Sequence, residues 1–82
     1  MTRTEIALRS AIRASAIAWF RAPNEGPEAS QARADCVRLC AKTRDSRIIR
    51  GAIHSACLRN KSADESAVVE FIFHALTRHV KR

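Results

Sequence analysis

Residues 22–27 hold both prolines and one of the two glycines of this 82-residue chain. Proline lacks a backbone N–H and clashes with the preceding helical turn, so no helix can continue through this segment. Outside it, apolar residues recur every three or four positions, which is typical of amphipathic helices. The sequence therefore predicts an all-α fold, in which one helix ends near residue 21 and the next begins at Pro27.

The remaining boundaries follow from capping signals. Thr2-Arg3-Thr4-Glu5 and Ser62-Ala63-Asp64-Glu65 have the spacing of a capping box, in which two side chains satisfy backbone N–H groups at a helix start. Thr43-Arg44-Asp45-Ser46 is rich in N-cap residues and separates two further helices. We therefore predict a single domain over residues 1–82, a small four-helix domain with helices over residues 2–21, 27–42, 46–59 and 62–81.

The apolar faces of these helices define the expected core. In the third helix this face comprises Ile48, Ile49, Ala52, Ile53, Ala56 and Cys57, and in the first it comprises Ala7, Leu8, Ala11, Ile12, Ala14, Ala18 and Trp19. Gly51 lies inside the third helix, where glycine costs about 1 kcal/mol relative to alanine. We expect either a neighbouring backbone close to Gly51 or local strain.

Two helices carry more apolar surface than one small core needs. The last helix has an apolar arc of roughly 200°, and a domain of this size buries only about 60% to 65% of its unfolded surface. In the first helix, Ile6, Ile17 and Phe20 form a second apolar patch, which either covers a neighbouring loop or is a partner interface. These features predict a homodimer.

Several protein classes are excluded. The longest run without charge or histidine lies between Arg13 and Arg21, far short of the roughly 20 apolar residues of a membrane span. Charged residues also interrupt any secretory signal in the N-terminal segment, so we expect a cytoplasmic protein with three reduced cysteines. The chain has no glycine-rich phosphate loop, no Gly-x-Ser-x-Gly and no His-Glu-x-x-His, and we expect neither enzymatic activity nor a cofactor.

A metal centre is the main chemical alternative. Cys36 and Cys40 are one helical turn apart, as are His54 and Cys57 on the next helix. Four such ligands from two adjacent helices would suit tetrahedral zinc. Their spacing matches no common zinc pattern, and buried free cysteines are frequent, so we expect no metal.

The charge carries the functional prediction. Fifteen basic and eight acidic residues give a formal net charge of +7, and the excess lies in the first and third helices. Arg44, Arg47, Arg50 and His54 form a stripe opposite the buried isoleucines, on which Asp45 is the one acid. Arginine binds phosphate bidentately. We therefore predict a small nucleic-acid-binding protein, a homodimeric regulator that binds double-stranded DNA.

Two alternatives stay open. Residues 44–82 loosely resemble the helical half of a ribbon-helix-helix domain, and the alternation within residues 36–42 fits the groove-reading strand which that resemblance implies, although it fits a helix equally well. The other alternative is a protein-interaction module, such as a small adaptor or a phage-type inhibitor. Its basic face would meet acidic side chains, and Ile6, Ile17 and Phe20 would be its hot spot.

Overall fold

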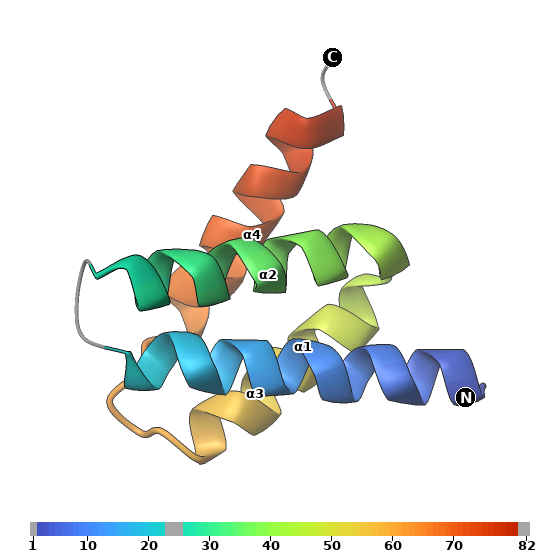
Figure 1. The fold of residues 1–82 in the computed structure, drawn as a ribbon. Helices are drawn as coiled ribbons and strands as arrows, with labels where there is room; N and C mark the ends of the chain where they lie inside the picture. The colour runs from blue at the N-terminus through green and yellow to red at the C-terminus, as the bar shows by residue number, and fades with distance from the viewer. Residues whose placement is uncertain (1, 23–25, 81–82) are drawn as a thin grey trace.

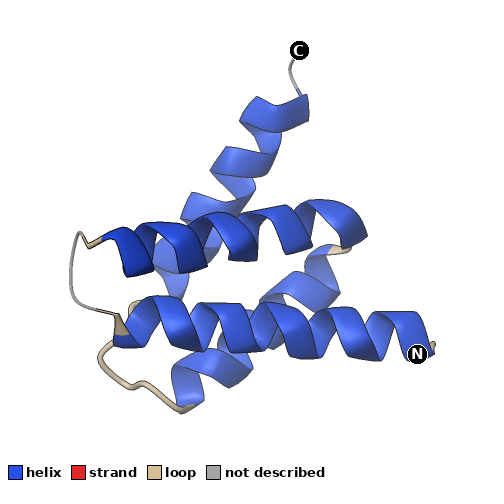
Figure 2. Cartoon of the chain, viewed as in Figure 1, coloured by secondary structure: helices blue, strands red, loops and turns tan. Residues whose placement is uncertain are grey.

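The computed structural model describes residues 2–22 and 26–80, with side chains described as far as residue 78. In these residues the chain forms α1 (Arg3–Arg21), α2 (Pro27–Thr43), α3 (Ser46–Leu58) and α4 (Glu65–Val80) (Figure 1). No strand is present in this part of the chain (Figure 2). The all-α prediction is confirmed. The strand alternative for residues 36–42 is wrong, because this segment continues α2 and turns its two cysteines into the core.

The helices form two layers. α1 and α2 run antiparallel, side by side, and α3 and α4 lie behind them (Figure 1). α1 packs against α2 and α3, whereas α4 packs against α2 and α3 but its backbone does not approach α1. The C-terminal half of α4 extends beyond the layer of α1 and α2 (Figure 1).

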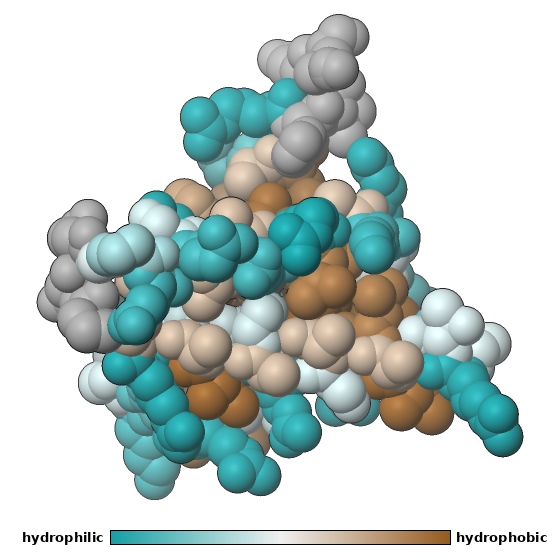
Figure 3. All heavy atoms as spheres, in the orientation of Figure 1, coloured by the Kyte–Doolittle hydropathy of each residue, from teal (hydrophilic) through white to brown (hydrophobic). Residues whose placement is uncertain are grey.

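The core lies where the four helices meet. It contains buried side chains from each helix. The largest fully buried side chains are those of Ile12, Cys36, Cys40, Ile49, Ile53 and Ile72. All six residues predicted to be buried in α3 are buried. In α1 the prediction is partly wrong: Ala7, Ala14 and Ala18 are exposed, whereas Ile12 and Ala16 are fully buried. α1 packs against both α2 and α3, and the space-filling view shows apolar side chains still visible along α1 (Figure 3).

The N-termini of α1 and α4 differ in how they are capped. At α1 the predicted capping box is confirmed: the Thr2 N–H donates to Glu5 Oε1 at 2.8 Å, and the Glu5 N–H donates to Thr2 Oγ1 at 3.1 Å. At α4 the predicted box at Ser62 is wrong. The Ser62 hydroxyl donates to Asn60, and Asp64 Oδ1 instead accepts the Ala67 N–H at 3.2 Å. α4 thus begins three residues later than predicted.

The predicted boundary between α2 and α3 is confirmed. Arg44 adopts a left-handed conformation with a φ of 55°, and its N–H donates to the Cys40 carbonyl at 2.9 Å. Asp45 then caps α3, because its carboxylate accepts the Arg47 N–H at 2.9 Å. The chain reverses direction within two residues, which places the start of α3 beside α1.

Candidate nucleic-acid interface

The four residues of the predicted basic stripe do not share one environment. His54 and Arg50 contact residues of α4, whereas Arg47 is exposed and lines a groove with Glu5 and Arg9 of α1. His54 Nδ1 lies 3.0 Å from Glu65 Oε1 and 3.3 Å from Glu65 Oε2. A carboxylate from another helix therefore already engages the histidine expected to contact phosphate.

Arg50 packs against an aromatic ring. Its guanidinium carbon lies 5.3 Å from the centroid of the Phe73 ring, within the range of a cation–π contact. The groove beside it is also lined by Glu65 and Glu70 of α4. The prediction that Asp45 is the one acid beside the stripe is thus wrong for its C-terminal half, because Glu65 and Glu70 of α4 lie beside Arg50.

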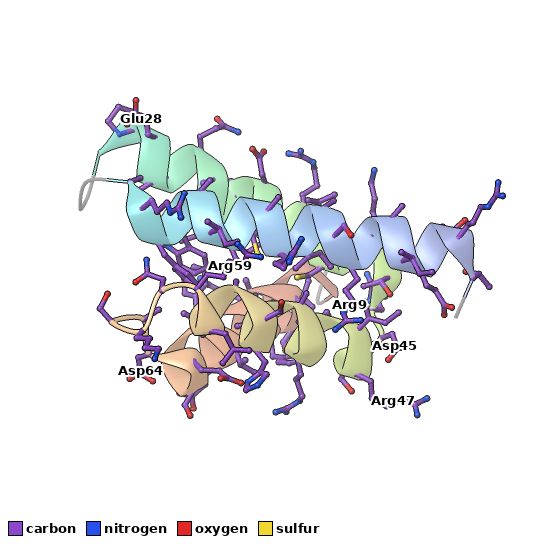
Figure 4. All side chains as sticks on the ribbon, turned by 90° about the horizontal axis from the view of Figure 1, so that it is seen from below. Arg9, Glu28, Asp45, Arg47, Arg59 and Asp64 are labelled. Atoms are coloured by element: carbon purple, nitrogen blue, oxygen red, sulfur yellow. The ribbon has the colours of Figure 1, made fainter. Side chains whose placement is uncertain are left out.

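Arg47 lies beside an arginine of α1. Arg9 and Arg47 line one groove of about 350 Å³, together with Glu5, Asp45 and Gly51. Figure 4 shows Arg9, Asp45 and Arg47 at the same end of the α1/α3 face. Two arginines from helices that are distant in sequence therefore line one groove, together with the carboxylates of Glu5 and Asp45.

The Arg9 side chain also explains the environment of Gly51. A Cβ atom built on Gly51 would lie 3.8 Å from Arg9 Nε and 4.0 Å from Arg9 Nη2, which is ordinary van der Waals contact. The expected close backbone or strain is therefore wrong. What passes over Gly51 is the flexible end of a charged side chain.

A second groove continues the basic surface along α1. It has a volume of about 270 Å³ and is lined by Ile6, Arg9, Ser10, Arg13 and Ser55. Two hydroxyl groups and two guanidinium groups thus border one depression between α1 and α3. We call Arg9, Arg13 and Arg47, with Ser10 and Ser55, the α1/α3 arginine surface.

The acids nearest this surface are already engaged by backbone groups. Glu5 accepts the Thr2 N–H and Asp45 accepts the Arg47 N–H, both as helix caps. Within the described part of the chain, the ion pairs shorter than 4.0 Å are Arg38–Asp35 and His54–Glu65. Arg9, Arg13 and Arg47 belong to neither.

Sequence reasoning missed Arg9, Arg13, Ser10 and Ser55. The excess of arginine in the first helix was a signal, but the helix wheel alone does not say which neighbour that face meets. Arg44 is exposed at the corner between α2 and α3. Of the four predicted residues, only Arg47 lines the new surface.

The zinc alternative is wrong. Cys36 and Cys40 are fully buried, whereas the His54 side chain is 60% exposed and pairs with Glu65. Among the side chains that the structure describes, no group of three or more His, Cys, Asp or Glu residues could hold a metal ion. The Cys40 thiol hydrogen-bonds to Cys36, which lowers the pKa of Cys36, whereas this bond and burial raise the pKa of Cys40.

The second apolar patch of α1 is divided. Ile17 and Phe20 pack against the core, and Phe20 also lines a depression with Ser62 and Ala63 of the loop before α4. Phe20 thus covers a neighbouring loop, as one of the two interpretations expected. Ile6, by contrast, is 52% exposed and lies at the edge of the α1/α3 arginine surface.

Comparison with protein families, with curated proteins and with solved structures finds no match to this chain. Among the helices of the described residues, none combines the length and the apolar character needed to cross a bilayer. The arrangement of the described side chains is therefore the basis for proposing a function.

Proposed function

We propose that this domain is a small nucleic-acid-binding protein that contacts the phosphates of double-stranded DNA through the α1/α3 arginine surface. The observation that carries the proposal is the placement of Arg9, Arg13 and Arg47 along two adjoining grooves between α1 and α3 that share Arg9, outside the ion pairs of the described side chains. Guanidinium groups bind phosphate oxygens bidentately and stay charged at every working pH.

Hydroxyl groups complete the chemistry of this surface. Ser10 and Ser55 border the same groove as Arg9 and Arg13, and serine side chains are frequent donors to phosphate oxygens. The net charge of +7 adds a long-range attraction to the local contacts. These features favour binding that positions the domain on the backbone and depends strongly on salt.

The aromatic residues favour duplex over single-stranded nucleic acid. Single strands are bound by stacking bases on exposed aromatic rings. Here Trp19, Phe20 and Phe73 are half-buried, and the guanidinium of Arg33 covers Phe71. None of these four rings lines the α1/α3 arginine surface.

The proposal includes a homodimer acting as a regulator. Ile6 and Leu58 are 52% and 62% exposed, and a second copy would remove such side chains from water. Light scattering of the purified chain is expected to give twice the monomer mass. A monomer mass at high concentration would remove the homodimer from the proposal.

Duplex binding measured against salt concentration tests the DNA proposal. We expect affinity to fall steeply between about 50 and 200 mM salt, with a slope near 3 in log–log form if three phosphates are neutralised. The double variant R9A/R47A should lower the affinity and reduce this slope by about 2.

R33A/R78A is the matched control, because it removes the same charge from residues outside the α1/α3 arginine surface. It should bind the duplex nearly as well as the wild type. Equal losses in the two variants would show a response to net charge alone, and absent binding at low salt would contradict the proposal.

A further inference from the structure

A groove between α2 and α4 is separate from the α1/α3 arginine surface. It has a volume of about 770 Å³, within the range of about 300–1000 Å³ of cavities that hold ligands. Its floor is apolar, formed by Ala34, Val37, Phe71 and Ala75. Within this floor Ala34 and Phe71 are exposed, and Val37 and Ala75 are half-buried.

Phe71 is held in place within this groove. The ring is 39% exposed, although it is large and apolar. Its centroid lies 5.7 Å from that of Trp19 at an angle of 59°, and the Arg33 guanidinium carbon lies 5.6 Å from it on one face. A partner would meet an anchor whose conformation is already set, which lowers the entropy cost of binding.

The rim of the groove is basic. Arg33, Arg38 and Arg78 line it, and none of the acidic residues that the structure describes does. Asp35 pairs with Arg38 at 2.9 Å, but the Arg38 side chain remains 62% exposed and keeps further N–H donors. The groove thus presents an apolar floor between positive charges.

This combination distinguishes among possible occupants. A second copy bound symmetrically would place three arginines against the same three arginines, since a two-fold interface joins identical surfaces. A nucleic-acid base would need a free ring face on Phe71, and Arg33 covers one face while Trp19 packs against the ring. An amphipathic helix with acidic flanks would place its apolar side chains on the floor and its carboxylates beside the arginines of the rim.

We propose that the α2/α4 groove binds an acidic amphipathic helix of another protein, with apolar side chains on Val37, Phe71 and Ala75 and carboxylates on Arg33 and Arg78. Apolar residues at positions i, i+3, i+4 and i+7 of the partner helix would lie along the floor. This site is independent of the DNA proposal, because none of these residues belongs to the α1/α3 arginine surface.

The experiment selects helical peptides that bind the full chain from a displayed library. The probe is a set of peptides of about 14 residues, with apolar residues at helical spacing and Glu, Lys or Ala at the other positions. We expect the enriched peptides to carry excess Glu and to lose at least about ten-fold in affinity on F71A or R33A/R78A.

Two further variants make the outcome decisive. A75E keeps the Trp19–Phe71 contact and places a carboxylate in the floor, and it should weaken binding by about ten-fold even if F71A is poorly folded. R9A/R47A removes the same charge as R33A/R78A and should bind the peptides like the wild type.

Four results would overturn the proposal. Enrichment without a preference for Glu, or binding that survives both A75E and R33A/R78A, would do so. A dimer that A75E dissociates would show that a second copy covers the groove. Loss of duplex binding in R33A/R78A but not in R9A/R47A would assign this face to nucleic acid instead, whereas loss in R9A/R47A alone concerns only the DNA proposal.

Discussion

The Arg50 guanidinium lies over the Phe73 ring, with 5.3 Å between the guanidinium carbon and the ring centroid. The contact joins α3 to α4 beside the His54–Glu65 pair, which joins the same two helices. α3 therefore uses two of its basic residues to hold α4. Arg47, one turn earlier, is exposed and lines a groove with Arg9 of α1.

Arg50 and Arg47 should respond differently to substitution. R50A loses the cation–π contact and the packing of the side-chain stem, so we expect a fall of about 0.5–1 kcal/mol in the free energy of unfolding. R47A should change this free energy by less than about 0.5 kcal/mol, because its side chain is exposed. Urea unfolding measures both, and equal effects would contradict the separate roles.

Gly51 offers a stabilising substitution. A methyl group at this position meets only the end of the Arg9 side chain, at 3.8 Å. G51A should therefore recover most of the helix-propensity difference, raising the free energy of unfolding by up to about 1 kcal/mol. The same denaturant experiment checks it. A loss of stability would mean that the helix needs glycine here.

Arg44 has an unfavourable backbone conformation. At a φ of 55° a residue with a Cβ atom is strained by roughly 1–2 kcal/mol, and glycine is not. Glycine loses more entropy on folding, which offsets part of the relieved strain. R44G should therefore raise the free energy of unfolding by about 1 kcal/mol relative to R44A. R44A is the control because it removes the same charge and keeps the Cβ atom. Equal stabilities would show that the corner relaxes.

Cys57 makes stability depend on alkaline pH. Burial raises the pKa of the Cys57 thiol, and the negative charges of Glu65 and Asp64 raise it further. The unfolded chain therefore releases this proton at lower pH than the folded one. Its contribution is fully present below about pH 8.5, where an ordinary thiol stays protonated, and is lost as pH rises through the folded pKa.

A thermal melt at several pH values checks this dependence. The Tm of the wild type should fall from about pH 8 to about pH 10, and that of C57V should fall less, because valine has no proton to release. Cys57 lies in the core, so C57V tests the slope with pH and not the stability itself. Identical slopes would contradict a role for Cys57.

The fold was predictable because its signals are local. The break at residues 22–27, the Thr2 capping box and the isoleucine periodicity of α3 each depend on a few adjacent residues. The α1 core was less predictable. α1 is almost equally rich in apolar residues on several faces, and only the positions of α2 and α3 select Ile12 and Ala16 for burial.

The candidate site was less predictable than the fold, because it depends on which helices become neighbours. A wheel drawn for α3 alone places Arg50 and His54 with Arg47. The approach of α4 brings Phe73 and Glu65 to the first two. The approach of α1 brings Arg9 to Arg47. Such pairings come from tertiary packing, and no pattern within one helix encodes them.

Two candidate N-cap residues, Ser62 and Asp64, lie within three positions at the start of α4. Asp64 is the observed cap: its carboxylate accepts the Ala67 N–H, and the Asp64 carbonyl accepts the Val68 N–H at 3.0 Å. Because α4 begins after Asp64, residues 60–63 form a turn, in which the Ala63 N–H donates to the Asn60 carbonyl at 3.0 Å.

D64A should therefore cost about 1 kcal/mol in the free energy of unfolding, the usual loss when an N-cap side chain is removed. S62A should cost less than about 0.5 kcal/mol, because its hydroxyl makes one solvent-exposed hydrogen bond, to the Asn60 side chain. Denaturant unfolding of both variants gives the comparison. The reverse order of effects would mean that α4 begins at the Ser62 capping box in solution.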